Sequence, residues 1–237
     1  MVELNNVAAS LAEAARTIDA RHSLEQTLDA IVRAASLSVP GIEHAGISTI
    51  DKHGRIRTRA ATDDLVLELD ELQYELGEGP CLDALRVGRV VSVPQLADDE
   101  RWPRYVAEAT RTTELKAQLA VQLFLDEEGV LGGLNMYSTA SAELDPDAQG
   151  VAELFATHAA IALGRAQEVG GLQTALASRK TIGQGIGILM ERYQMSEDRA
   201  FAFMTRASSH GNVKLRDLAL ELVEQLNEGE GEPPSFP

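Results

Sequence analysis

Residues 117–138, AQLAVQLFLDEEGVLGGLNMYS, contain the strongest strand signal in the chain. Two apolar runs flank an acidic turn with a glycine at position 129, a pattern that predicts a β-hairpin. Gly132 and Gly133 weaken the second run as a strand, and they indicate a bulge or a close packing contact. We therefore expect a sheet with this hairpin at its centre.

The segments before the hairpin alternate between helical and strand patterns. Apolar residues from Leu24 to Ala35 recur at helical spacing, and Pro40-Gly41 should end that helix. The other elements are predicted in chain order as a strand–turn–strand at 44–62, a helix at 63–76, an irregular GEGPC turn at 77–81, a strand at 89–95, and a loop with a short helix at 98–110. This mixture predicts an α+β domain.

A long helix is predicted from about Pro146. Residues of mixed character lie three and four apart along it, as in a heptad seam: Val151, Leu154, His158, Ile161, Arg165, Glu168 and Leu172. The glycine pair 170–171 is a candidate hinge within this helix.

The last part of the chain predicts a compact three-helix unit. Its first helix carries one apolar stripe, formed by Ile182, Ile186, Leu189, Met190 and Tyr193. Ser196 should cap the second helix, and residues 210–212 break the chain before a regular third helix at 215–226. The final EGEGEPPSFP is predicted to be a disordered tail.

Composition places the chain among cytoplasmic, soluble proteins. Neither a signal peptide nor an apolar window long enough to cross a membrane is apparent in its 237 residues. The net charge of −16 argues against nucleic acid, because phosphate contacts need Lys and Arg. However, residues 172–227 hold seven basic and six acidic residues, so the acidity belongs to the front of the chain. Such asymmetry fits an acidic sensor with a separate effector.

The segment from Leu176 to Val223 resembles the ANTAR family over nearly its whole length. The matching positions are Ala177, Arg179, the run IGQGIGILMER at 182–192, Met195-Ser196, Ala200-Phe201, Asn212, Lys214, Leu215 and Ala219. One departure matters: many members carry Ala-Lys-Gly where this chain has Gly185-Ile186-Gly187, so a lysine often present there is missing. No RNA role can be carried over to that position.

The front of the chain, from about Ser23 to Arg165, resembles a GAF domain in the order of its elements and in the stretch GEGPCLDAL at 77–85. Together the two segments resemble actinobacterial GAF–ANTAR regulators. The resemblance implies binding to paired stem-loops in nascent mRNA leaders, which prevents a terminator hairpin from forming. It also implies a homodimer, since two loops need two ANTAR units.

The expected fold is therefore an α+β GAF domain, with an antiparallel sheet flanked by helices, joined by a long helix of coiled-coil character to an all-α ANTAR domain. The expected boundaries are an N-terminal helix at 1–22, the GAF sensor at 23–150, a connecting helix at 151–171, the ANTAR domain at 172–227 and the tail at 228–237.

Basic and amide side chains of the three-helix unit are the RNA-binding candidates, because RNA loops are recognised through phosphate charge and splayed base edges. They are Arg179, Lys180, Gln184, Arg192, Lys214 and Arg216. The competing interpretation is that each is an ordinary solvated charge. Tyr193 could stack on a base, but it continues the apolar stripe and is expected in the core.

No catalytic site, metal site or cofactor is predicted. Cys81 is the single cysteine, so it lacks a resolving partner and is expected to be a small buried apolar group. The five histidines are scattered without metal-ligand spacing. The GAF input, a small molecule or a protein, is not identified by any residue.

Three other functions stay open. The three helices could bind DNA, although a recognition helix rich in Leu, Glu and Asp suits a phosphate backbone badly. The unit could serve only for dimerisation or protein binding within a GAF signalling protein. The GAF domain could also be an enzyme that uses Cys81.

Overall fold

The computed structural model describes residues 23–51, 53–86, 89–125 and 129–228, which form two compact units divided between Ala166 and Gln167. The N-terminal helix predicted at 1–22 and the tail from residue 229 lie outside the described residues. Among the described helices, none has both the length and the apolar character needed to cross a membrane.

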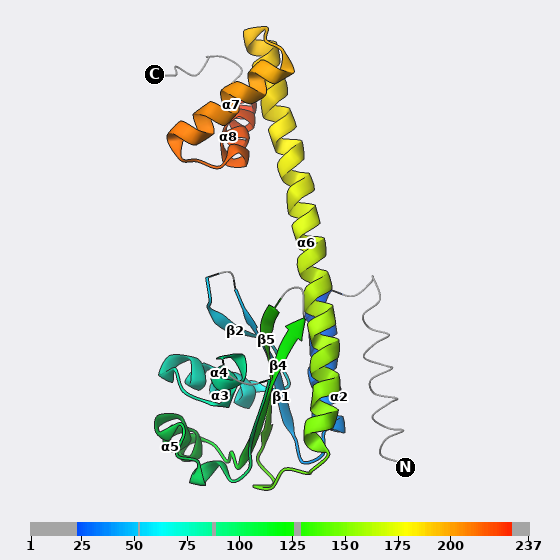
Figure 1. Cartoon of the computed structure of the whole chain (residues 1–237), viewed down its shortest axis with the longest axis vertical. Coiled ribbons are helices and arrows are strands. Elements are labelled where there is room, and N and C mark those ends of the chain that lie inside the picture. Colours follow the sequence, from blue (N-terminus) through cyan, green and yellow to red (C-terminus); the bar gives the residue numbers. More distant parts are fainter. Residues whose placement is uncertain (1–22, 52, 87–88, 126–128, 229–237) are drawn as a thin grey trace. The chain divides into compact units, whose positions relative to one another are not determined.

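Unit 1 is built on a five-stranded antiparallel sheet in the order β2-β1-β5-β4-β3 (Figure 1). Its elements are α2 (Leu24–Ser38), β1 (His44–Ile50), β2 (Ile56–Ala61), α3 (Asp64–Leu76), α4 (Pro80–Arg86), β3 (Val90–Val93), a 3-10 turn (Leu96–Asp98), α5 (Pro103–Thr112), β4 (Ala117–Leu125), β5 (Gly129–Ser138) and the first part of α6 (Ala148–Tyr193). The predicted hairpin is confirmed as β4 and β5, and β5 is the central strand.

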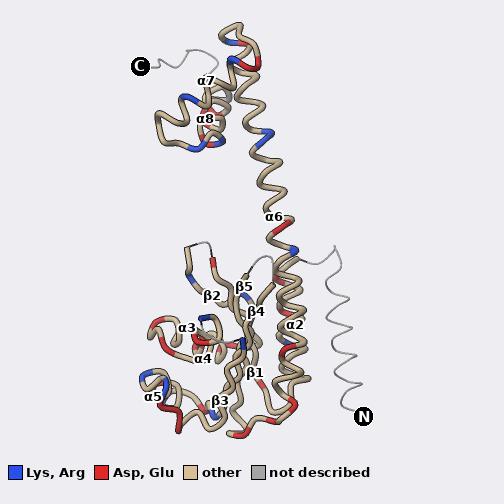
Figure 2. The backbone as a smooth tube through the Cα atoms, viewed as in Figure 1, with Lys and Arg blue, Asp and Glu red and all other residues tan. Residues whose placement is uncertain are grey.

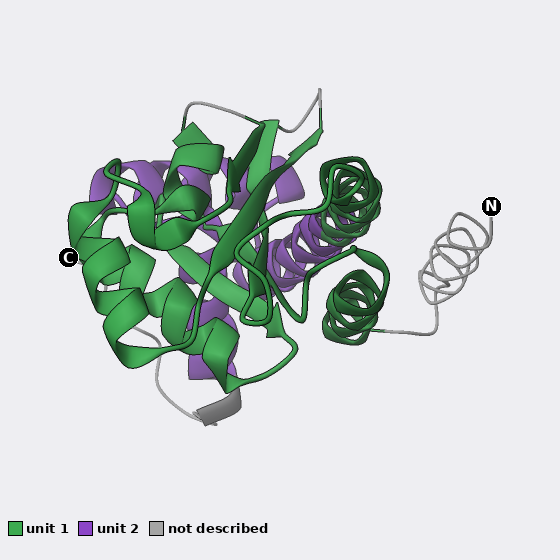
Figure 3. Ribbon diagram, turned by 90° about the horizontal axis from the view of Figure 1, so that it is seen from below, with its two compact units in different colours: residues 1–166 green, residues 167–237 purple. Residues whose placement is uncertain are grey.

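Helices cover both faces of the sheet, with α2 and α6 on one face and the shorter helices on the other (Figure 3). The side chains of β4 alternate between these layers: Leu119, Val121 and Leu123 enter the core with α2 and α6. Gln118 instead lies on the face covered by α3 and α5, where it bonds to Tyr105. One face of the sheet is therefore apolar, and the other carries buried polar groups.

Local sequence explains the helix that opens the unit. Ser23 caps α2 in a reciprocal arrangement: its hydroxyl accepts from the Gln26 amide at 3.2 Å, and the Gln26 side chain accepts from the Ser23 amide at 2.9 Å. The predicted apolar stripe is buried, with Leu28 and Ile31 fully inaccessible to solvent. The helix ends at Ser38, before the proline.

Gly132 supports the close-packing interpretation of the glycine pair. A Cβ atom at position 132 would lie 1.9 Å from the carbonyl oxygen of Ser48 on the neighbouring strand β1. A pairing irregularity also interrupts the β4–β5 ladder between Leu123 and Phe124, directly beside this glycine. Glycine is thus needed because two backbones approach too closely for a side chain.

One local prediction was incomplete. The GEGPC stretch was predicted as an irregular turn, but Pro80 begins helix α4, because proline is compatible with the first turn of a helix. Gly77 and Gly79 supply the turn before it, with φ angles of 67° and 134°. The long helix predicted from about Pro146 is confirmed as α6, a single helix of 46 residues from Ala148 that continues through the glycine pair 170–171.

Candidate functional site

Unit 2 is a three-helix unit made of the end of α6, α7 (Glu197–Gly211) and α8 (Leu215–Glu228). Its small core contains five buried side chains: Leu189, Ala200, Met204, Ala219 and Leu222. Ser196 occupies the predicted N-cap of α7 in extended conformation, but its hydroxyl makes no capping hydrogen bond. The acidic first turn, Glu197 and Asp198, still suits the positive end of the helix.

Gly185 is the position where α6 meets the other two helices. A Cβ atom there would lie 3.1 Å from Ala219 Cβ on α8 and 3.3 Å from Met204 Cε on α7. Ile186, which stands where many ANTAR members have lysine, packs against the same core, whereas the Cβ position of Gly187 is open. The altered triplet therefore contributes to helix packing and offers no charge.

Lys and Arg residues occur on all three helices of unit 2 (Figure 2). Arg179, Lys180 and Gln184 are exposed, and the last two are four residues apart on α6. Residues at that spacing share one face of a helix. Lys180 and Gln184 therefore present a cation and an amide side by side to solvent.

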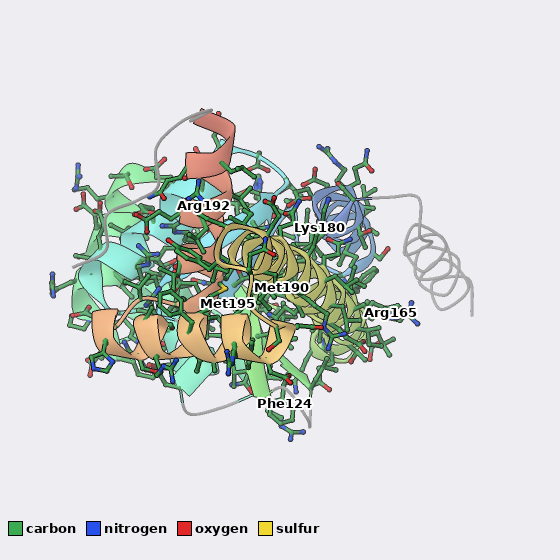
Figure 4. The ribbon with its side chains drawn as sticks, turned by 90° about the horizontal axis from the view of Figure 1, so that it is seen from above. Phe124, Arg165, Lys180, Met190, Arg192 and Met195 are labelled. Atoms are coloured by element: carbon green, nitrogen blue, oxygen red, sulfur yellow. The ribbon has the colours of Figure 1, made fainter. Side chains whose placement is uncertain are left out.

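The remaining three candidates are placed differently. Arg192 is half-buried and leaves α6 in a different direction from Lys180 (Figure 4). Arg216 forms an ion pair with Asp217, whose Oδ1 is 2.9 Å from its terminal nitrogen, so its charge is partly neutralised. Lys214 is exposed and immediately precedes α8. The partial positive charge at the N-terminus of that helix adds to the charge of the lysine. The six residues thus do not make one continuous face.

Two aromatic residues of unit 2 are exposed without having been predicted so from the sequence. Tyr193 was expected in the core, but it is 42% exposed. Phe201 on α7 is 47% exposed. Arg199 and Arg206 on the same helix are also exposed, and their signal in the sequence was only their charge. Flat aromatic groups beside cations are typical of surfaces that contact unpaired bases.

Unit 1 contains a buried polar network between the sheet and the short helices. Asp70 on α3 is fully buried and accepts hydrogen bonds from Thr58 Oγ1 at 2.6 Å, from Asn135 Nδ2 at 2.8 Å and from the Tyr137 hydroxyl. Burial raises the pKa of the Asp70 carboxyl despite these donors. The Asn135 Oδ1 atom has no hydrogen-bond partner in the described part of the chain.

This network continues as a chain of side chains across the domain. The Tyr105 hydroxyl on α5 donates to Gln118 Oε1 at 2.7 Å, and Gln118 Nε2 reaches Gln73 Oε1 at 3.5 Å. Gln73 Nε2 then donates to the Tyr137 hydroxyl at 3.1 Å, and that hydroxyl donates to Asp70. Four secondary-structure elements are therefore coupled through fully buried polar groups.

Cys81 lies at the edge of this network and is fully buried, as expected. Its sulfur is 3.6 Å from the Ser48 hydroxyl, and burial raises the pKa of the thiol to about 12. A thiol in that state is a poor nucleophile. Among the described residues, no group of three metal-ligating side chains gathers.

A surface groove of about 200 Å³ lies on unit 1, between the β3–β4 edge of the sheet and α6. It is lined by side chains from the β3–β4 edge and α6: Arg89, Val90, Val121, Gln122, Phe124, Glu153, Ala156 and Thr157. The Arg89 guanidinium stands 4.9 Å from the centre of the Phe124 ring.

Comparison with known proteins agrees with both units. A GAF domain model matches residues 21–164, and an ANTAR domain model matches residues 171–223. ANTAR domains are RNA-binding domains of antitermination regulators, and GAF domains are sensory; both are regulatory rather than catalytic in type. Among curated proteins, none shows significant sequence similarity to the chain.

Solved GAF domains share the fold of unit 1. One is the GAF domain of a phosphoenolpyruvate-protein phosphotransferase from Coxiella burnetii, with 16% identity and a TM-score of 0.55 over 70% of this chain and 97% of that one. Another, from Acinetobacter, has 16% identity and a TM-score of 0.53 over 72% of this chain and 98% of that one. At this identity the likeness shows the fold alone. The sheet, its flanking helices and both domain matches together show that the chain belongs to the GAF family and carries a C-terminal ANTAR domain, the architecture of GAF–ANTAR regulators.

Proposed function

We propose that this protein is a transcription antitermination regulator whose ANTAR domain, at about 172–227, binds paired stem-loops in nascent mRNA leaders. The GAF domain, at about 23–150, receives a small-molecule or protein signal, and residues 151–171 connect the two. The observation that carries the proposal is the exposed set Arg179, Lys180 and Gln184 on a matched ANTAR domain.

Charge distribution supports this assignment. Residues 172–227 hold seven basic and six acidic residues, within a chain of net charge −16. In the ANTAR domain, therefore, acidic residues do not outnumber basic ones. Lys180 and Lys214 are exposed and form no ion pair in the described part of the chain, whereas Arg216 is paired with Asp217. Unpaired cations are the groups that replace condensed counterions on a phosphate backbone.

A homodimer is part of the proposal, because two loops require two ANTAR units. The buried polar network around Asp70 is the proposed sensory core of the GAF domain, since it links four elements through groups that a signal could rearrange. No cofactor is required for RNA binding in this scheme.

The test is binding of the full chain to a tandem pair of hexanucleotide-loop RNA hairpins, with a single hairpin and a matched duplex DNA as comparisons. We expect the tandem RNA to bind most tightly. The double variant Lys180→Ala with Lys214→Ala should weaken that binding and reduce the slope of log affinity against log salt by about 4, because each of the two bound ANTAR units loses two cations.

The matched control is Arg33→Ala with Arg57→Ala, which removes two exposed charges from unit 1. This control should leave both affinity and slope unchanged. Equal weak binding to all three nucleic acids would reject the RNA function and favour a unit that serves dimerisation or protein binding. Preference for the duplex would instead favour DNA binding.

A further inference from the structure

The surface groove of unit 1 carries one charge of each sign. Arg89 immediately precedes β3 and Glu153 lies on α6, and both exposed side chains line the groove. In the described part of the chain neither of them forms an ion pair. The Arg89 guanidinium stacks on the Phe124 ring, and Glu153 accepts a hydrogen bond from the Gln149 side-chain amide at 2.9 Å. The groove therefore offers a cation and a carboxylate that are both available to a ligand.

Aliphatic side chains line the same groove. Val90 and Val121 are partners in the β3–β4 ladder, and Val121 is buried at the sheet edge. Ala156 is buried on α6, three residues after Glu153 and therefore on the same face of that helix. The groove thus combines its two charges with a firmly packed apolar lining.

The position and the orientation of Arg89 suit it to bind a carboxylate. Its carbonyl oxygen accepts a hydrogen bond from the Gln122 amide at 2.8 Å, which holds its backbone against β4. A guanidinium that stacks on an aromatic face keeps the N–H groups at its edge free. These N–H groups match the two oxygens of a carboxylate, which they can bind through two parallel hydrogen bonds.

The size of the groove limits its ligand to a small metabolite. A volume of about 200 Å³ equals that of roughly seven water molecules, which is too little for a nucleotide. Glu153 would repel a ligand that is only an anion, and Arg89 would repel one that is only a cation. A carboxylate and an ammonium group on a short aliphatic body satisfy both charges and the apolar lining, and a free aliphatic amino acid has this chemistry.

We propose that this groove binds a small aliphatic amino acid, with its carboxylate on Arg89, its ammonium group on Glu153 and its side chain against Val90 and Ala156. The site is separate from the buried network around Asp70, which lies between the sheet and the short helices. A ligand in the groove would link the edge of the sheet to α6. The inference goes beyond the proposed function and does not depend on RNA binding.

Binding and its location are tested together by NMR titration of the full chain with L-leucine and with L-valine. We expect saturable shifts of the backbone amide signals of Val90, Gln122 and Thr157, with a Kd of about 0.1–1 mM. The amide signal of Asn135, in the buried network, should not move. Shifts at Asn135 without shifts in the groove would overturn the site, as would the absence of saturation by either amino acid up to about 20 mM.

The roles of the two charges are tested with two analogues of leucine. Isocaproate lacks the ammonium group and isoamylamine lacks the carboxylate, so both should bind the wild-type chain about tenfold more weakly than leucine. Glu153→Gln should weaken leucine binding about tenfold and strengthen isocaproate binding, because the repelling carboxylate is gone. Arg89→Gln should weaken leucine binding to a similar extent and strengthen isoamylamine binding.

This exchange of preference separates a charge-specific site from general damage to the groove. Variants that weaken all three ligands alike, or that change none of them, would overturn the proposed roles of Arg89 and Glu153. The matched controls are Glu168→Gln on α6 and Arg57→Gln on β2, which remove exposed charges outside the groove and should bind leucine as wild type does. Because no RNA is present in these titrations, failure of the proposed function would leave their result unchanged.

Discussion

Replacing Asp70 tests the buried network at the point where its hydrogen bonds converge. Three donors end on this carboxylate: the hydroxyls of Thr58 and Tyr137 and the amide of Asn135. In Asp70→Ala the Thr58 hydroxyl can turn to the Tyr74 oxygen, which is 3.0 Å away. The other two donors stay buried without an acceptor, at about 1–3 kcal/mol each, so the free energy of unfolding should fall by roughly 2–6 kcal/mol.

Asp70→Asn should cost much less. Its amide oxygen can still accept from Tyr137 and Asn135, and its nitrogen can donate to Thr58, whose hydroxyl then donates to Tyr74. We expect a loss of about 1 kcal/mol relative to wild type. Urea denaturation of all three proteins, followed by circular dichroism, measures both values. An alanine variant as stable as the asparagine variant would refute the reasoning.

A comparison of wild type with Asp70→Asn also tests the ionisation of Asp70. Burial raises the pKa of this carboxyl in the folded state above its unfolded value of about 3.9. Its contribution to stability is therefore complete below the unfolded pKa and is lost as the pH rises through the folded pKa. The stability of wild type relative to Asp70→Asn should therefore fall as the pH rises above about 4. A difference that is constant or grows with pH would contradict the raised pKa.

Three further predictions concern single positions. Gly132→Ala should prevent stable folding of unit 1, because its Cβ would meet the Ser48 carbonyl. Gly187→Ala, where the added Cβ meets open space, should raise the melting temperature by an amount equivalent to about 1 kcal/mol. Thermal denaturation of the two variants measures both effects. The Cys81 thiol, with its pKa near 12, should react with an aromatic disulfide reagent at pH 8 only after unfolding, and rapid reaction of the native protein would disprove its burial. Met204→Ala should destabilise unit 2 by about 2–5 kcal/mol, which hydrogen exchange would detect as lost protection in α7 and α8 with unit 1 unchanged.

The sequence predicted the elements whose patterns are local. The central hairpin, the first helix and the three-helix unit were predicted because apolar periodicity and turn residues act over a few positions. The glycine at 132 was also interpretable, since a glycine within a strand indicates close approach of a backbone. The start of α4 at Pro80 was missed because a Gly-Glu-Gly-Pro run has the composition of a loop.

The buried network could not be predicted, because its members are far apart in the chain. Asp70 bonds to Tyr137, 67 positions away, and nothing in the acidic sequence of α3 distinguishes it from exposed neighbours such as Glu68 and Glu71. The exposure of Tyr193 was missed for a related reason. A stripe predicts which face of a helix is apolar, but not which of its residues the neighbouring helices cover.

The RNA-binding residues stay predictions from charge and exposure. Arg216 shows why the charge of a residue in the sequence is not enough. Its ion pair with Asp217 partly neutralises a charge that was counted in full from the sequence. The heptad spacing at 151–172 was visible in the sequence, but only the structure shows that Leu154, Ile161 and Leu172 are exposed.

The most direct test of the central claim is single-round transcription with purified polymerase on a template whose leader encodes tandem hairpins followed by a terminator. We predict that the wild-type chain raises the fraction of full-length transcript, and that a template with both loops replaced at equal length shows no response. The Lys180→Ala, Lys214→Ala variant should be inactive while Arg33→Ala, Arg57→Ala retains activity. Equal termination with and without the wild-type protein, under conditions in which it binds the tandem RNA, would contradict the account.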